Sequence, residues 1–234
     1  DKPCDVLLCQ EMLRDMDKVH VAVAQAAQKK MHCILHASVC TPAGGLSAGV
    51  AVLAAWQRGL RAVDLPREFT TTHARCCMAY WPGLLARGVV VVSLYLHTSE
   101  PIDGPNNGKL LQQVEIALRT LGIPFIIGGD WQSAPVLLSD MGMPKRLRAT
   151  VVHPGATTYM SGPTATEIDY FLVSDVLLPF VVSCQAVAGT PVAKHLPVNL
   201  VLRTSMVGGV PMGLCKPSMY PVGRPIGPAN KPVP

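Results

Sequence analysis

Three acidic residues and one histidine stand where they could act together on a phosphate group. Glu11 ends the apolar run DVLLCQE, Asp130 ends FIIGGD, Asp169 lies inside EIDYFLVS, and His195 follows further along the chain. In an α/β sandwich, acids at the ends of buried strands can hold a divalent cation and supply a general base beside one phosphate. The order of these segments therefore predicts a metal-dependent phosphodiesterase. Any one of these acids by itself is more typical of a solvated strand end.

The elements that must position these residues are predicted by the spacing of apolar side chains. Residues 12–30 and 107–121 have helical spacing, and Gly122 is suited to end the second helix. Residues 73–80 and 89–96 should form a hairpin, because Trp81-Pro-Gly between them supplies turn chemistry. The remaining segments are expected strands at 4–10, 31–40, 49–55, 125–130, 170–174, 181–187 and 197–202, and a loop with a short helix at 132–149.

Composition favours one sheet-rich domain. The chain has 234 residues, of which 49% are hydrophobic and only 15% charged, with 20 Gly and 21 Pro, so strands and turns are expected rather than long amphipathic helices. Residues 1–203 should form the domain, and 204–234 a Pro/Gly-rich tail or linker without periodic apolar residues. The net charge of +5 fits a phosphate-bearing partner but is weak evidence for one.

Cysteine usage and hydropathy predict a soluble protein of a reducing, intracellular compartment, the nucleus included. The eight cysteines lie mostly within apolar runs and none forms a Cys-x-x-Cys pair, so neither disulfides nor a zinc site are expected. Arg87 and Pro179 limit the most apolar runs, and none reaches the length of about 18–20 residues needed to span a bilayer.

The motifs, taken in order, resemble the endonuclease/exonuclease/phosphatase superfamily, which has the deoxyribonuclease-like fold. The resemblance covers residues 4–202 and rests on DVLLCQE, GLSAGVAVL, VVVVSLYLH, IIGGDWQSAP, EIDYFLVS and AKHLPVNLVL. It implies an α/β fold, a four-layer sandwich of two mixed β-sheets flanked by helices. It also implies that the motif residues converge at one end of the sandwich, with Asp169 within hydrogen-bonding distance of His195.

The resemblance assigns a role to each candidate residue. Glu11 matches the family's metal ligand, which would hold Mg²⁺ or Mn²⁺. Asp130 matches the base that activates the attacking water, and its two preceding glycines would let the backbone approach substrate. Gln132 stands at the family's phosphate-contacting asparagine and adds one methylene to it.

Three further residues complete the expected site. Asp169 and His195 match a pair in which the carboxylate fixes the imidazole tautomer and the histidine binds or protonates the phosphate. Tyr95 occupies the position of the family's catalytic Tyr or His, and His97, two residues later on the same strand face, is an alternative for that role.

Two departures from the family pattern favour a rival interpretation. Lys194 stands at the family's aspartate before the histidine, where an ammonium group reverses the charge that a cation needs. The family's first strand, with its asparagine, would precede residue 4, so the fold is expected to lack an inner strand. The rival is a degenerate domain without catalytic activity that binds nucleic acid or protein.

The best-supported interpretation is a nucleic-acid endonuclease, with DNA as the expected substrate. A chain that starts at Asp1 and ends in a Pro/Gly-rich stretch further suggests a module of a retrotransposon-like polyprotein. A phosphatase or lipid phosphodiesterase of the same superfamily is the second enzymatic alternative, because these activities differ in loops whose preferences the sequence does not reveal.

Overall fold

The computed structural model describes residues 4–63, 74–189 and 194–203 of the chain. Strands dominate it, with helices placed between them. In chain order the elements are β1 (Val6–Cys9), α1 (Met16–Gln28), β2 (Met31–His36), β3 (Val39–Cys40), β4 (Leu46–Ser47), β5 (Val50–Ala55), the 3-10 helix η1 (Trp56–Arg58), β6 (Arg61–Ala62), β7 (Cys76–Trp81), β8 (Val89–Tyr95), α2 (Pro105–Leu121), β9 (Phe125–Asp130), α3 (Pro135–Asp140), α4 (Met143–Leu147), β10 (Ala149–Val152), β11 (Tyr159–Ser161), β12 (Thr164–Thr166), β13 (Asp169–Ser174), η3 (Asp175–Phe180), β14 (Val181–Ala186) and β15 (Val198–Leu202).

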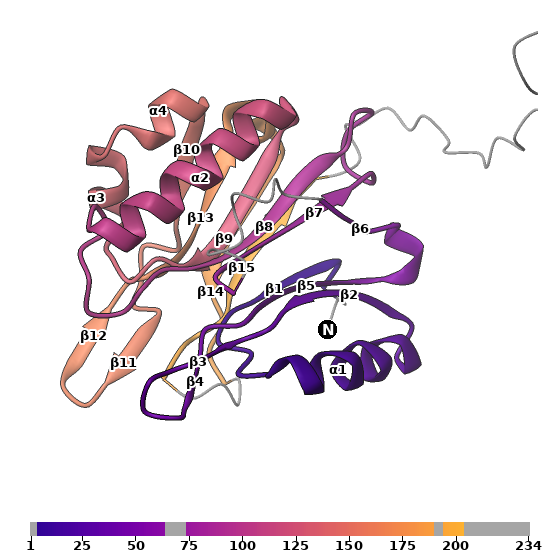
Figure 1. Cartoon of the computed structure of the whole chain (residues 1–234). Coiled ribbons are helices and arrows are strands. Elements are labelled where there is room, and N and C mark those ends of the chain that lie inside the picture. Colours follow the sequence, from indigo (N-terminus) through magenta and orange to yellow (C-terminus); the bar gives the residue numbers. More distant parts are fainter. Residues whose placement is uncertain (1–3, 64–73, 190–193, 204–234) are drawn as a thin grey trace, which may run out of the picture.

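These elements stack in layers, as Figure 1 shows. The helices α2, α3 and α4 cover one face of a six-stranded sheet, a three-stranded sheet packs on its other face, and α1 lies outside the smaller sheet. The predicted four-layer α/β sandwich is therefore confirmed. Only the larger of these two sheets is mixed, because β8 and β9 run parallel whereas β1, β5 and β2 pair antiparallel throughout.

The larger sheet has the strand order β10-β13-β9-β8-β7-β6 and is covered on both faces. Its central strand β8 is Val-rich and every residue of it is buried, which is the pattern of a strand that packs on two layers. Alternate residues of each strand enter two separate cores. One core lies against α2, α3 and α4, and the other lies between the two sheets.

The smaller sheet has the order β1-β5-β2, with β5 in the middle. Only β5 is mostly buried, whereas all residues of β2 are half-buried. Helix α1 covers the outer face, but Ala26 is its only buried residue. The outer pair of layers is therefore packed less completely than the inner pair.

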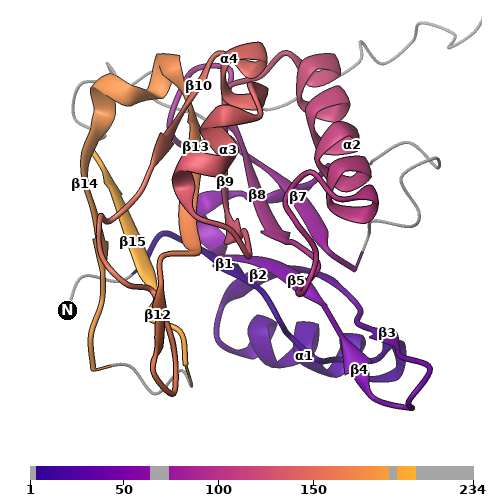
Figure 2. The same ribbon diagram turned by 90° about the vertical axis from the view of Figure 1, so that its left-hand side faces the viewer.

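Three two-stranded units complete the described part of the chain (Figure 2). β14 and β15 pair with each other beside β13. Among the described residues, β1 pairs only with β5, and β15 pairs only with β14. The hairpins β3–β4 and β11–β12 extend from one end of the sandwich. That end also holds the last residues of β8 and β9.

The structure corrects the sequence prediction mainly at helix ends and in short strands. Helix α1 begins later than predicted, with Asp15 as its N-cap, and α2 begins at Pro105 and ends before the left-handed Gly122. Strand β10 and the hairpin β11–β12 were not predicted. The expected tail 204–234 lies outside the described residues. No helix in the described ranges is long and apolar enough to cross a membrane.

Candidate active site

The candidate site is built on a row of three side chains across neighbouring strands of the larger sheet. Tyr95 at the end of β8 is in register with Asp130 at the end of the parallel strand β9. Asp130 is in turn opposite Asp169 at the start of the antiparallel strand β13. Residues opposite each other in a sheet project from the same face. Here that face is the one toward the smaller sheet, because Tyr95 belongs to the core between the sheets.

The two glycines before Asp130 serve packing inside the domain. A Cβ at Gly128 would collide with the side chains of Leu8 and Phe171, and one at Gly129 would collide with the backbone of Leu94. The smaller sheet and β8 therefore approach β9 closely at these positions. Packing therefore requires glycine at both positions, and the expected approach of this backbone to substrate stays a prediction.

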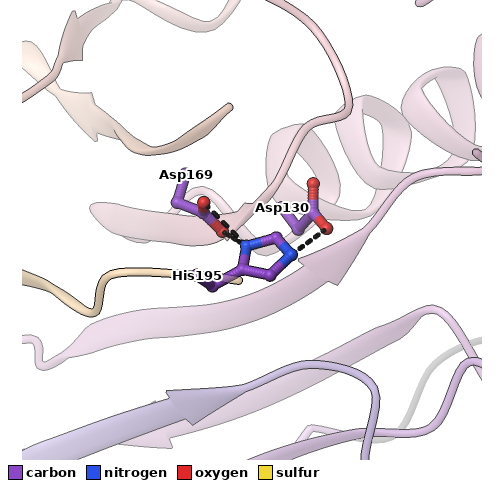
Figure 3. A group of neighbouring side chains, drawn as sticks. All are labelled: Asp130, Asp169 and His195. Atoms are coloured by element: carbon purple, nitrogen blue, oxygen red, sulfur yellow. Dashed lines mark hydrogen bonds and ion pairs between the residues drawn. The ribbon is translucent and has the colours of Figure 1, made fainter. Parts of the chain in front are cut away.

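His195 lies beside both aspartates, with one ring nitrogen directed to each of them (Figure 3). Its Nδ1 is 3.0 Å from Oδ2 of Asp169, and its Nε2 is 4.0 Å from Oδ2 of Asp130. One ligand atom from each of these three residues lies within 4.8 Å of the others. The imidazole is therefore oriented by Asp169 and presents its second nitrogen beside Asp130.

The neighbouring hairpin holds His195 in place. Tyr159 of β11 forms an isolated β-bridge with His195, and the two rings lie 4.8 Å apart between centroids. Thr158, the residue before Tyr159, is fully buried. Its hydroxyl accepts hydrogen bonds from the backbone N–H groups of Ile168 and Asp169. The hairpin base thus connects the loop of His195 to the start of β13.

Gln132 contacts the Asp130 carboxylate twice. Its backbone N–H donates to Oδ1 at 3.1 Å, and its side-chain Nε2 donates to Oδ2 at 2.6 Å. The residue has a left-handed backbone with φ of 50°. The longer amide side chain folds back onto Asp130 and orients the carboxylate, and the expected contact of Gln132 with the phosphate stays a prediction.

Glu11 joins the site from the smaller sheet. It is exposed, two residues beyond the end of β1, and its Oε1 accepts a hydrogen bond from the Tyr95 hydroxyl. The preceding residue, Gln10, donates to the buried Ser93 hydroxyl at 2.9 Å, and Ser93 donates to the carbonyl of Cys9 at 2.7 Å. These bonds attach the end of β1 to Ser93, which lies two residues before Tyr95 on β8.

Two residues singled out in the sequence lie apart from this cluster. His97 lies beyond β8 in a loop where its backbone N–H donates to Asn107, and no described contact connects its imidazole with the acids. Lys194 is exposed and has a left-handed backbone with φ of 65°. Its carbonyl accepts a hydrogen bond from Met160, and its ammonium makes no ion pair with a described residue. The electrostatic role of Lys194 stays a prediction.

The environment raises the pKa of three site residues. Burial, together with the nearby charge of Asp169, raises the pKa of Asp130 to about 7, although the Gln132 hydrogen bonds oppose the shift. The hydrogen bond that His195 donates to Asp169 raises the pKa of His195, whereas burial opposes the shift. Burial also raises the pKa of Tyr95, and its bond to Glu11 adds to the effect. Perturbed groups that converge in this way are typical of active sites.

The donor set fits a hard divalent cation. Glu11, Asp130 and Asp169 supply carboxylate oxygens, which Mg²⁺ and Mn²⁺ prefer, at one edge of the sandwich. In the described residues one oxygen of Glu11 accepts from Tyr95 and its second oxygen has no hydrogen-bond partner. An exposed carboxylate in this state can accept a cation without breaking an existing bond.

Sequence patterns gave no indication of several residues that shape this site. Arg75 and Tyr159 lie outside the motifs, and Ser93 lies inside VVVVSLYLH but was given no role. Each residue type is common at such positions, so only the fold reveals that these three contact the predicted residues. The structure brings together Glu11, Tyr95, Asp130, Gln132, Asp169 and His195, and their catalytic roles stay predictions.

Known protein structures resemble this fold over most of its length. A 3′ phosphatase, NExo, from Neisseria bound to a product DNA hairpin matches with a TM-score of 0.65 at 18% identity, over 86% of this chain and 90% of that one. The AP endonuclease LMAP from Leishmania major matches with a TM-score of 0.65 at 16% identity, over 85% and 78%. The endonuclease domain of TRAS1, a telomere-specific non-LTR retrotransposon, matches with a TM-score of 0.57 at 16% identity, over 86% and 99%.

Sequence comparison alone gives no match, either to a protein-family profile or to a curated protein. The structural neighbours all have the fold of the endonuclease/exonuclease/phosphatase superfamily, and this confirms the fold that the motif resemblance implied.

Proposed function

We propose that this domain is a metal-dependent phosphodiesterase that cleaves nucleic acid, with DNA as the expected substrate. The observation that carries the proposal is the row of Tyr95, Asp130 and Asp169, completed by a His195 ring that faces both aspartates. An acid–acid–histidine cluster beside an exposed Glu11 has the groups that phosphodiester hydrolysis needs. Structural neighbours that are AP endonucleases and a retrotransposon endonuclease support the choice of substrate class.

Asp130 is the proposed base. Its carboxylate is oriented by two hydrogen bonds from Gln132 and lies at the edge of the core, with a pKa raised to about 7. A base whose pKa is near neutral accepts a proton from water effectively while remaining partly ionised. Asp130 therefore takes the proton from the attacking water.

His195 is the proposed partner of the phosphate. Asp169 accepts from Nδ1, which fixes the tautomer and raises the pKa of the imidazole. The Nε2–H is then available to donate to a phosphate oxygen or to the leaving oxygen. Tyr95 holds Glu11 through its hydroxyl and lines the same edge.

Glu11, with a carboxylate of the cluster, would hold Mg²⁺ or Mn²⁺. When bound, such an ion stabilises the negative charge that develops on the phosphate.

Plasmid nicking and cleavage of a duplex with one abasic site test the proposal. The protein with Mg²⁺ or Mn²⁺ should cleave, and Asp130→Asn should reduce the rate by about 10³-fold, because it removes the base. Asp140→Asn is the matched control, since Asp140 is an exposed residue in α3 outside the site. Cleavage that survives Asp130→Asn would contradict the assignment.

A DNA 3′-phosphatase is the second candidate, because the neighbour NExo is one. An oligonucleotide with a 3′-phosphate distinguishes the two functions, since only a phosphatase releases inorganic phosphate from it without shortening the strand. Binding of DNA without any turnover would instead favour the degenerate-domain alternative.

A further inference from the structure

Arg75 lies beside the candidate site, and no sequence motif indicated a role for it. It lies directly before β7, and its carbonyl accepts a hydrogen bond from the Tyr95 backbone N–H at 2.9 Å. Its side chain is half-buried and turns back over the end of β8. The guanidinium carbon lies 4.9 Å from the centroid of the Tyr95 ring. This is within the range of a cation–π contact.

The guanidinium is anchored on two sides. Nη1 donates to the carbonyl of Leu96 at 3.1 Å and reaches that of Tyr95 at 3.5 Å. Nη2 donates to the hydroxyl of Ser47 in β4 at 3.2 Å. The group therefore connects the end of β8 with the base of the β3–β4 hairpin while it covers one face of the Tyr95 ring.

This arrangement uses properties that are specific to arginine. A planar fork can bond two carbonyls and a hydroxyl while its flat face contacts an aromatic ring, whereas lysine offers a point charge on a flexible stem. Burial lowers the pKa of Arg75, and the charges of Glu11 and Asp130 oppose that shift. The cation thus lies in the electric field of the acids without forming an ion pair with either.

We propose that Arg75 is a positioning residue, which holds the Tyr95 hydroxyl against Glu11 and thereby fixes the proposed metal ligand. This inference rests on the proposed function, in which Glu11 and Tyr95 act at the phosphate. Tyr95 projects from the well-packed sheet and Glu11 from the less completely packed one. The hydroxyl contact between them determines where the Glu11 carboxylate lies, and Arg75 restricts the ring that carries this hydroxyl.

A double-mutant cycle tests the inference kinetically. Arg75→Lys keeps the positive charge and should lower kcat for abasic-site cleavage about tenfold, with KM changed less than about twofold, because geometry rather than attraction is lost. In a Tyr95→Phe background, which lacks the hydroxyl, the same change should have an effect of less than about twofold. An equal loss in both backgrounds would overturn the proposal.

Two further variants separate positioning from general stability. Arg58→Lys is the matched control, since Arg58 forms an ion pair with Asp5 at the other end of the smaller sheet, and it should leave kcat unchanged. Ser47→Ala removes one anchor of the guanidinium and leaves Tyr95 intact. It should lower kcat about two- to threefold in the same direction. If Arg75→Lys does not fold, an unchanged kcat in Ser47→Ala overturns the inference.

A spectroscopic measurement decides the question independently of activity. The chain has five tyrosines, so ring-labelled tyrosine gives few NMR signals, and Tyr95→Phe identifies the one from Tyr95. Arg75→Lys should move that signal and leave the other tyrosines unchanged, and Arg58→Lys should move none near the site. An unmoved Tyr95 signal overturns the role of Arg75. If the parent protein cleaves no substrate, the proposed function fails, while the NMR comparison still shows whether Arg75 positions Tyr95.

Discussion

The two sheets of the sandwich differ in how completely they are buried. All residues of β8 in the larger sheet are buried, whereas all residues of β2 in the smaller sheet are half-buried. The covering helices differ in the same way, because α2 buries seven residues and α1 only Ala26. Tyr95, Asp130 and Asp169 project from the well-packed sheet, and Glu11 follows a strand of the other. The candidate base is therefore held rigidly, while the candidate metal ligand depends on contacts such as that with Tyr95.

A metal titration offers the strongest test of this division. Asp130→Asn should lose about 10³-fold in rate at every Mg²⁺ concentration, because added metal cannot replace a base. Glu11→Gln should instead raise the Mg²⁺ concentration for half-maximal activity by roughly tenfold or more and recover much of its rate at high metal. Rates measured over a wide range of Mg²⁺ concentrations would show this difference. If Asp130→Asn and Glu11→Gln respond alike to added metal, the separate roles of base and metal ligand are contradicted.

Matched truncations compare the packing of the two sheets directly. Leu172→Ala in β13 removes a side chain with no exposed surface and should lower the free energy of unfolding by about 3–5 kcal/mol. Leu35→Ala makes the same change in the half-buried β2 and should lower it by only about 1–2 kcal/mol. Urea unfolding of both variants provides the values. Equal losses would mean that the smaller sheet is as tightly packed as the larger.

The buried base should reduce stability in a pH-dependent way. The pKa of Asp130 is raised from 3.8 to about 7 on folding, so its ionised form is disfavoured in the folded state. The resulting loss of stability is fully present above pH 7 and disappears as the pH falls toward 4. Asp130→Asn should therefore be more stable than the parent by about 1–3 kcal/mol above neutrality, with no difference near pH 4.

Unfolding curves at several pH values check this expectation, and Asp140→Asn serves as an exposed control that should show no such trend. A stability difference that persists unchanged at pH 4 would show that Asp130 affects packing rather than proton affinity.

The smallest effect is expected at Lys194. Its side chain is exposed and makes no ion pair with a described residue, so solvent and salt screen its charge from the acids. Lys194→Asp should raise Mg²⁺-dependent cleavage about two- to fivefold at low salt and less at high salt. Asp130→Asn in the same background controls for contaminating nuclease. A lower rate in Lys194→Asp would identify Lys194 as a phosphate ligand.

The long elements could be predicted because their local patterns are unambiguous. β8 and β9 are continuous apolar runs, and α2 has helical spacing with Gly122 after it, so the structure confirms them within a few residues. Strands β10, β11 and β12 were missed because they are short, and β12 consists of Thr and Ala, which do not form an apolar pattern. β10 also depends on β13 as its partner, whereas β11 and β12 pair with each other across a short turn.

The candidate acids were identified from the sequence because each stands in a short motif at a strand end. Sequence alone thus determined the fold class and six residues that converge at one edge. Only the tertiary structure decided how they are held. The register of β8, β9 and β13 places Tyr95, Asp130 and Asp169 in one row, and the turn of Arg75 over Tyr95 brings a cation beside them. Such contacts join residues from separate strands, and no local pattern encodes which side chains will meet when two sheets pack.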